Sequence, residues 1–305
     1  MKIAVITPIN KRDYLTDTVL DGLGELGIDH KRSDKEERKS FVAYAREAEL
    51  ILFCWGKTVK KWRIFDFNNT NYLLAEEINC WNKTVFIDGN EVGRDGRARG
   101  LVAEPNRAML KKCALYFKRE KPYPPRVLPL PFGITKNMIA WQPDVKKDID
   151  FFCVFGKHDE YLPLRWQVTD ELKRFCAANN FSCVTERMPK EEFLQKLARS
   201  KVGISVGGGG FDTLRFWEIL ANNCLLMTEQ IDIYPDNGKG ELDYSRIWQF
   251  KDLAGFRTQL EKIGNIIRSQ ALDLKISEYQ NILPTHSSSA RVQIIITAAK
   301  DQGII

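Results

Sequence analysis

Short apolar runs alternate with amphipathic segments along most of the chain. Runs of about four to eight residues match strands that are buried on both faces of a parallel sheet. The longer segments repeat apolar residues at the three- and four-residue spacing of a helix. The predicted strands are 2–7, 50–55, 84–89, 114–117, 149–156, 181–184, 202–206 and 224–228. The predicted helices are 15–26, 34–48, 72–81, 101–112, 164–179, 190–199 and 213–221, and the chain reads as helical from about 250 onward.

This alternation predicts an α/β fold, because strands that alternate with helices at such spacing form doubly wound parallel sheets. A chain of 305 residues is about twice the usual domain length, so we expect two domains. Five prolines between 121 and 131 interrupt the alternation, which resumes at 148. We therefore expect two Rossmann-like domains, at 1–130 and 131–285, that face a central cleft. A final helical segment at 286–305 is expected to cross back to the first domain.

Cysteine and histidine usage bears on metals and location. The seven cysteines are scattered without a CxxC pair, and only three histidines are present. Free thiols in a reducing cytosol explain this pattern better than a metal site or a disulfide framework. No apolar run approaches the roughly 20 residues of a membrane span, and the apolar run at the amino terminus breaks at Pro8. We expect a cytoplasmic protein without a bound metal.

The formal net charge of +6 suits an anionic partner without identifying it. Nucleic acid, acidic lipid head groups and phosphorylated substrates all fit this charge. The basic residues are dispersed along the chain, apart from one local cluster. That cluster comprises Lys111, Lys112, Lys118, Arg119 and Lys121.

The segment 201–229 carries the most chemical information. It reads as a strand, a loop containing Gly207, Gly208, Gly209 and Gly210, a helix and a second strand. Glycines let a backbone approach a ligand closely, and the amino end of a helix favours anions. The sequence therefore predicts a diphosphate site at this loop.

Side chains around the loop add to this interpretation. Asp212 or Thr213 can cap the helix. Arg215 and Glu218 are three residues apart and share a helix face. An arginine suits phosphate, and a carboxylate suits the two hydroxyls of a ribose. Phe216 and Trp217 are expected to pack in the core.

The run from Asp212 to Glu218 resembles the donor-binding motif of GT-B fold glycosyltransferases, of the form Asp-Thr-x-Arg-x-Trp-Glu. The resemblance is to a bacterial group and covers about 148–300. It implies that Glu218 holds the ribose of a nucleotide sugar. The residues implied to surround the diphosphate and donor sugar are Gly156, Lys157, His158, Arg165, Gly207, Gly208, Gly209, Gly210, Phe211, Asp212 and Thr213.

The chain departs from the family pattern at two positions. Asn223 stands where glycine is usual after the helix, which affects the turn. Gly210 stands where many retaining members place a glutamate, so the stereochemical outcome stays open.

Candidates in the amino-terminal half follow its predicted strands. Asp88 ends a strand and is the leading candidate for a base that deprotonates the acceptor hydroxyl. An aspartate that forms a turn is the alternative. Glu91, Asp95 and Asp13 are substitute candidates for the base.

Lys118 and Arg119 follow the last strand predicted in this half. We expect them to face the cleft and to bind acceptor or phosphate. Arg215 is the second residue to which we assign a catalytic role, because the departing diphosphate needs positive charge.

These observations predict a glycosyltransferase, of hexosyl or a related type, that uses a nucleoside diphosphate sugar and no other cofactor. The expected acceptor is a saccharide or a lipid-linked molecule in surface polysaccharide or glycoconjugate synthesis, and the charge permits contact with an anionic membrane face. Nucleic acid is not expected as a partner. Two alternatives stay open: a sugar-nucleotide epimerase or hydrolase on the same fold, and a noncatalytic protein that binds nucleotide sugar or nucleic acid.

Overall fold

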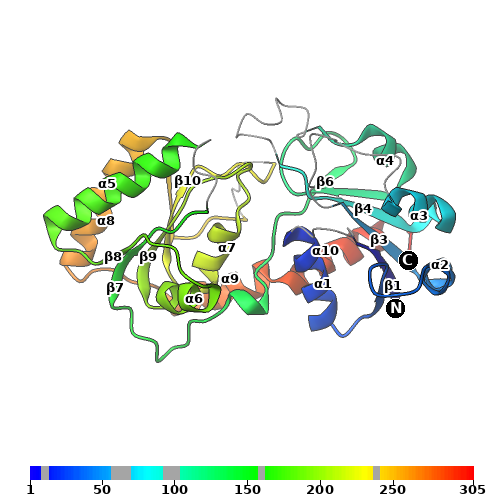
Figure 1. Cartoon of the computed structure of the whole chain (residues 1–305), viewed down its shortest axis with the longest axis horizontal. Coiled ribbons are helices and arrows are strands. Elements are labelled where there is room, and N and C mark those ends of the chain that lie inside the picture. Colours follow the sequence, from blue (N-terminus) through cyan, green and yellow to red (C-terminus); the bar gives the residue numbers. More distant parts are fainter. Residues whose placement is uncertain (8–13, 56–69, 92–103, 157–161, 236–240) are drawn as a thin grey trace. The chain divides into compact units, whose positions relative to one another are not determined.

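A computed structural model describes residues 1–7, 14–55, 70–91, 104–156, 162–235 and 241–305. Its contacts divide the chain into two compact units, each containing a parallel sheet with helices packed on it (Figure 1). Unit 1 comprises Met1–Thr135, Ile233–Pro235 and His286–Ile305, and unit 2 comprises Lys136–Asp232 and Asp236–Thr285.

The described residues of unit 1 form a six-stranded parallel sheet in the order β2-β1-β3-β4-β5-β6. All six residues of β3 are buried, as expected for a strand covered on both faces. The elements are β1 (Lys2–Ile6), α1 (Tyr14–Glu25), β2 (Asp29–Arg32), α2 (Arg38–Glu47), β3 (Leu50–Trp55), α3 (Thr70–Ile78), η1 (Trp81–Lys83), β4 (Thr84–Asp88), α4 (Arg107–Lys112), β5 (Leu115–Lys118), β6 (Val127–Pro129) and α10 (Ser288–Asp301).

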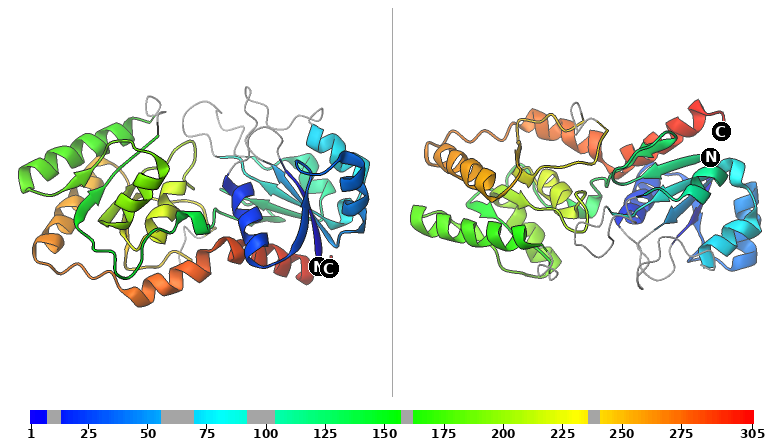
Figure 2. Two further views of the ribbon diagram at one scale, coloured as in Figure 1. Left: turned by 60° about the horizontal axis from the view of Figure 1, so that its bottom comes forward. Right: turned by 90° about the horizontal axis from the view of Figure 1, so that it is seen from above.

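Helix α10 belongs to unit 1 and packs against α1. The hydroxyl of Ser288 donates to Asp21, at 2.6 Å. Gly22 lies so close to the backbone of Ser288 that an added Cβ would overlap its carbonyl oxygen. The two ends of the chain consequently lie near one another on unit 1 in all three views (Figures 1 and 2).

The described residues of unit 2 form a five-stranded parallel sheet in the order β11-β10-β9-β7-β8. One face packs against α5 and α8, and on the other Phe193 of α6 meets Phe152 of β7. The elements are η2 (Lys136–Met138), β7 (Ile149–Phe152), α5 (Pro163–Asn179), β8 (Cys183–Val184), α6 (Lys190–Ala198), β9 (Ser200–Ser205), α7 (Leu214–Ala221), β10 (Leu225–Glu229), β11 (Ile247–Phe250), α8 (Leu253–Arg268) and α9 (Ile276–His286).

The fold class predicted from the sequence, with two Rossmann-like parallel sheets, is confirmed. Three strands were not predicted. β2 is polar throughout, β11 lies near the start of a region read as helical, and β6 lies within the proline-rich segment. β6 is an edge strand, where proline is tolerated because one side of the strand needs no ladder hydrogen bond. The helix predicted at 34–48 begins only at Arg38.

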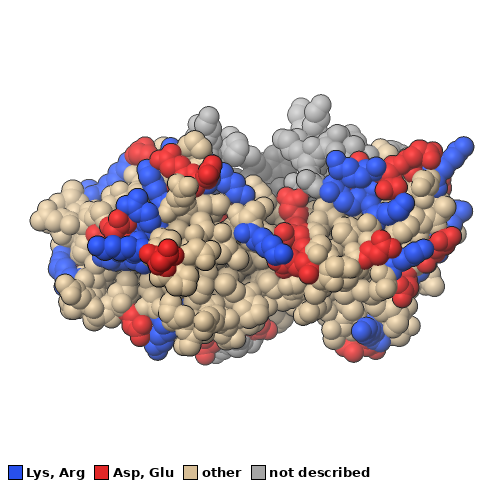
Figure 3. Space-filling view, turned by 90° about the horizontal axis from the view of Figure 1, so that it is seen from below, with Lys and Arg blue, Asp and Glu red and all other residues tan. Residues whose placement is uncertain are grey.

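The described residues were compared with the features expected of a charged binding surface, a membrane span and a metal site. On the face drawn in Figure 3, basic and acidic side chains are intermixed over the described residues. Among the described helices, none combines the length and apolar content that a bilayer crossing requires. In the same ranges, no group of histidine, cysteine or acidic side chains is arranged to hold a metal ion.

Candidate functional site

The strand order of unit 2 reverses between β7 and β9. The chain leaves β7 towards β8 on one side, and returns to add β9, β10 and β11 on the other. Doubly wound sheets bind ligands beyond the carboxyl ends of their strands at such a switch point. The segments there are 153–156 after β7 and 206–213 after β9. The predicted glycine segment therefore lies where the topology expects a ligand.

Two arginines connect these two segments reciprocally. Arg165, in the first turn of α5, donates from Nε to the carbonyl of Gly207 and from Nη2 to that of Val206, both at 3.1 Å. Arg215, in the first turn of α7, donates from Nε to the carbonyl of Val154 at 3.1 Å. Each helix that follows one strand thus supports the loop that follows the other. Both guanidinium groups are held at the switch point.

Further contacts orient the two guanidinium groups. Nη1 of Arg215 donates to Oε2 of Glu218 at 2.6 Å, and the Arg215 guanidinium lies 3.8 Å from the ring centre of Phe193. The guanidinium of Arg165 lies 5.2 Å from the ring centre of Phe155. Aromatic faces attract cations and fix their position. The Arg215 and Glu218 side chains are 20% and 10% exposed, so both lie largely inside the unit.

The glycine segment is itself hydrogen bonded. The N–H of Gly207 donates to Oε2 of Glu229 at 2.9 Å, and the N–H of Gly208 donates to the carbonyl of Gly210 at 2.8 Å. The N–H groups of Gly207 and Gly208 are therefore both engaged within unit 2. Because glycines have no side chains, backbone hydrogen bonds fix the conformation of this loop. Glu229, the last residue of β10, supplies one of the acceptors.

Gly208 lies close to the side chain of Arg165. A Cβ at this position would lie 3.1 Å from Nη2 of Arg165. Gly208 and Gly209 are half-buried, whereas Gly207 and Gly210 are buried. Contact with a ligand would involve the central pair of glycines.

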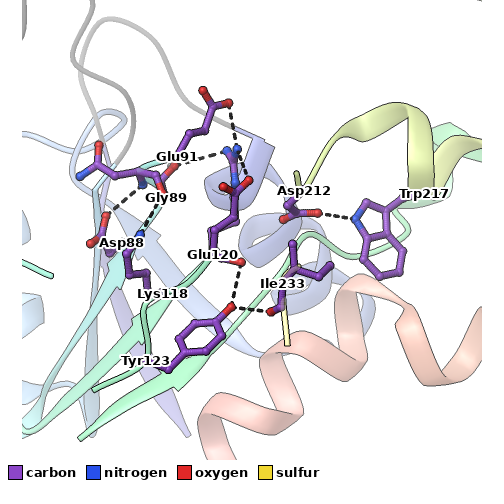
Figure 4. Close-up of polar contacts among 11 residues, drawn as sticks. Asp88, Gly89, Glu91, Lys118, Glu120, Tyr123, Asp212, Trp217 and Ile233 are labelled. Atoms are coloured by element: carbon purple, nitrogen blue, oxygen red, sulfur yellow. Dashed lines mark hydrogen bonds and ion pairs between the residues drawn. The ribbon is translucent and has the colours of Figure 1, made fainter. Parts of the chain in front are cut away.

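The two candidate caps of α7 have different roles. Oγ1 of Thr213 accepts from the N–H of Phe216 at 3.4 Å, so Thr213 is the cap. The carboxylate of Asp212 accepts from Nε1 of Trp217 at 2.7 Å (Figure 4). Asp212 is 2% exposed and Trp217 is fully buried, as is Phe216. The structure thus gives Asp212 a bond in the core of unit 2.

Asn223 occupies a left-handed conformation, with φ of 52°. Asparagine tolerates this region better than most residues. Its Oδ1 also accepts from Nη1 of Arg246 at 2.7 Å. Asn223 can therefore form the turn after α7 without being a glycine.

In unit 1, the carboxylate of Asp88 is almost fully enclosed, with 1% exposure. Its Oδ2 accepts from the hydroxyl of Tyr116 at 2.6 Å, and its Oδ1 accepts from the N–H of Asn90 at 2.9 Å. Burial raises the pKa of Tyr116, and the charge of Asp88 raises it further. This is the turn-forming alternative that the sequence left open. A role for Asp88 as a base stays a prediction.

Lys118 and Arg119 are buried rather than displayed on the surface, with 0% and 2% exposure. Nζ of Lys118 donates to the carbonyl of Asn90 at 3.1 Å, and Nη1 of Arg119 donates to that of Gly89 at 3.3 Å (Figure 4). Buried carbonyls need donors, and these two cations supply them to the loop after β4. Both cations thus have partners within unit 1, and their binding of acceptor or phosphate stays a prediction.

The buried position of Lys118 affects its protonation. Burial lowers its pKa, although the nearby carboxylates of Asp88 and Glu120 act in the opposite direction. Nη2 of Arg119 pairs with Glu91 at 2.8 Å and with Glu120 at 3.2 Å. These charges form one network at the carboxyl ends of β4 and β5.

Some predicted residues lie outside the described part of the chain. These are Lys157 and His158, together with the substitute bases Asp13 and Asp95. Gly156 is exposed at the last described position after β7, and Phe211 is half-buried.

Sequence reasoning did not find the aromatic partners of the two arginines. Phe155 neighbours Gly156 and was read only as part of a strand. Phe193 comes from α6, which the chain places beside α7 only after folding. No spacing in the sequence joins Phe193 to Arg215, so no local signal could have identified it.

No family model matches the sequence, and the comparison with curated proteins finds no match. Solved structures do resemble it. A glycosyltransferase from Rickettsia africae matches with a TM-score of 0.55 and 8% identity, over 99% of this chain and 98% of the other. Sucrose-phosphate synthase from Thermosynechococcus elongatus gives the same four values. HepE from Anabaena, in complex with UDP-glucose, matches with a TM-score of 0.54 and 9% identity, over 99% of this chain and 100% of the other.

The chain has the GT-B fold. At identities of 8% and 9%, these similarities establish the fold and not the activity.

Proposed function

We propose that this protein is a glycosyltransferase that moves a sugar from a nucleoside diphosphate sugar to an acceptor hydroxyl. Unit 2 binds the donor in this proposal, and unit 1 binds the acceptor. The acceptor is a saccharide or a lipid-linked molecule of surface polysaccharide or glycoconjugate synthesis, which the enzyme reaches from the cytoplasm or from the inner membrane face.

The observation that carries the proposal is the pair of arginines at the switch point of unit 2. Arg165 and Arg215 support the segments after β7 and β9 from the first turns of two helices. Helix amino ends and guanidinium groups both favour phosphate oxygens. A diphosphate placed here would meet two cations, two helix ends and the half-buried pair Gly208 and Gly209. The GT-B fold and a structural neighbour in complex with UDP-glucose support the same ligand class.

Glu218 supplies the contact for the ribose. A carboxylate has several acceptor positions, and the bond from Arg215 reaches only Oε2. The remaining capacity suits the two ribose hydroxyls. The ion pair with Arg215 fixes the side chain before the ligand binds.

Catalysis in this proposal rests on positioning and on stabilisation of the leaving diphosphate. As the bond between sugar and diphosphate breaks, negative charge grows on the departing oxygen. Arg215 and the amino end of α7 would meet that charge without reorganisation. The proposal assigns no step to Asp88.

Turnover of candidate donors tests the proposal. UDP, GDP, ADP and dTDP sugars are each incubated with and without a panel of saccharide acceptors, and nucleoside diphosphate release and sugar products are measured. The proposal expects acceptor-dependent release that Arg215→Gln lowers by about 10²–10³, the usual effect of removing one charge-stabilising donor. Arg174→Gln is the matched control, because that side chain is 70% exposed on α5.

The other outcomes identify the alternatives. Release of diphosphate without acceptor would indicate a hydrolase, and conversion of the donor sugar would indicate an epimerase. Equal activity of Arg215→Gln and Arg174→Gln would overturn the assignment of the site.

A further inference from the structure

Three of the seven cysteines gather beneath helix α5 in unit 2. Cys183 in β8 pairs with Phe151 in β7, so both side chains lie on the same face of the sheet. Cys153 follows Phe151 by two residues and shares that face. Cys176 of α5 packs into the same apolar cluster from above. The thiols therefore approach one another from a strand edge, a strand end and a helix.

Cys176 and Cys183 are the closest partners in this group. The thiol of Cys176 donates a hydrogen bond to the sulfur of Cys183. The turn between them is closed by the N–H of Phe181, which donates to the carbonyl of Cys176 at 3.1 Å. Cys176 is buried, whereas Cys183 lies on an edge strand and is partly exposed. One thiol of the pair is thus open to a small reagent, and its neighbour is in reach.

The pair also differs in acidity. The hydrogen bond from Cys176, helped by the charge of Lys173 and opposed by burial, lowers the pKa of Cys183 to about 7. The same interaction and burial raise the pKa of Cys176. Burial raises the pKa of Cys153 to about 12. A reactive thiolate beside a protonated thiol is the arrangement found in redox-active pairs.

We propose that Cys176 and Cys183 form a redox modification site that a hydroperoxide converts to a disulfide between α5 and β8. With hydrogen peroxide, the Cys183 thiolate attacks one oxygen, the O–O bond breaks, and the departing hydroxide takes up the proton that Cys183 had released, so that one water leaves. The sulfur of Cys176 then attacks the resulting sulfenic acid, and its proton leaves with the hydroxide as a second water. Two thiols lose two electrons and the peroxide gains them.

This site is separate from the proposed donor function. A covalent link at Cys176 would fix the carboxyl half of α5 to the sheet edge, and Arg165 lies in the first turn of the same helix. Whether or not the protein transfers sugar, the oxidation chemistry stands on the thiols alone.

Trypsin offers a direct readout. Cleavage after Arg174 and Arg187 releases a peptide that holds Cys176 and Cys183 and no other cysteine. The full-length protein is treated with limiting hydrogen peroxide, the oxidant is removed, free thiols are blocked with N-ethylmaleimide in denaturant, and the peptides are weighed. We expect this peptide to lose two hydrogens and to take up no maleimide, with reversal by dithiothreitol. Cys153 and Cys224 should remain fully blocked by maleimide.

Two variants test the roles of the partners. Cys176→Ala removes both the thiol and the hydrogen-bond donor. It should stop the disulfide, leave a sulfenic acid at Cys183 that dimedone captures, and slow iodoacetamide labelling of Cys183 at pH 7 by about tenfold, since an ordinary thiol has a pKa near 8.5. Cys183→Ser should abolish oxidation of the peptide. A wild-type peptide that takes up two maleimides after peroxide treatment, or labelling of Cys183 whose rate is unchanged in Cys176→Ala, would overturn the proposal.

Discussion

The hydrogen bond between Asp212 and Trp217 anchors the end of the segment 206–213 to α7, and its contribution to stability can be measured. Both side chains are buried, and 2.7 Å separates the carboxylate Oδ1 from the indole Nε1. A hydrogen bond to a charged group contributes about 1.5–3 kcal/mol to the free energy of unfolding. Asp212→Ala and Trp217→Phe should each lower the free energy of unfolding by at least that amount.

A double-mutant cycle isolates the bond from other effects. Trp217→Phe also leaves a cavity, and Asp212→Ala also removes volume, so each single variant overstates the bond. The double variant should be less destabilised than the sum by about 1.5–3 kcal/mol. Asp212→Asn keeps an acceptor oxygen and should be the mildest of the four.

Urea unfolding followed by circular dichroism measures these changes. Two units can unfold in separate transitions, so each transition is fitted by itself, and the effect should fall in that of unit 2. A coupling below about 0.5 kcal/mol is within ordinary additivity and would refute the account of Asp212 as a structural partner of Trp217.

Two further predictions concern stability. Gly22→Ala should cost about 1–3 kcal/mol, because the added methyl meets the backbone of Ser288 in α10, whereas Gly24→Ala on the same helix has open space and should not destabilise; thermal melts of both compare them. Burial raises the pKa of Asp150, but bonds from Lys201 and its neighbours outweigh this and lower it overall, so its contribution to stability is present above about pH 4 and is lost as pH falls through the folded pKa. Asp150→Asn should be less stable than wild type at pH 7, and urea titrations should show this difference shrinking as pH falls below about 4, the pKa of a free aspartate. A difference that stays constant as pH falls would contradict the assignment.

The architecture could be predicted because it rests on burial. β3 is buried along its whole length and is a continuous apolar run. β2 has the sequence Asp-His-Lys-Arg, and its pairing with β1 is not encoded in hydrophobicity. Edge position and tertiary pairing determine such a strand, so a pattern of apolar residues does not reveal it.

The candidate site was predicted only in part, for a related reason. Short-range spacing placed Arg215 and Glu218 on one helix face, and the structure joins them at 2.6 Å. The bond from Arg165 to Gly207 joins residues that are separated in the sequence by two strands and a helix. It forms because the strand order places β9 beside β7. The bond from Lys118 to the carbonyl of Asn90 also joins residues that are distant in the sequence, so no local pattern could have predicted it.

The proposed donor site is tested most directly by the effect of nucleotides on thermal stability. A ligand at 100 times its dissociation constant stabilises the folded state by about 2.7 kcal/mol, which a melting curve resolves. Melting curves of wild type, Glu218→Ala and Glu261→Ala are recorded with UDP, GDP, CMP, dTDP and ADP. Glu261→Ala is the control, because the side chain of Glu261 is exposed on α8. We predict that one nucleotide stabilises wild type and Glu261→Ala alike and that Glu218→Ala abolishes the shift. An undiminished shift in Glu218→Ala would contradict the placement of the donor at the switch point of unit 2.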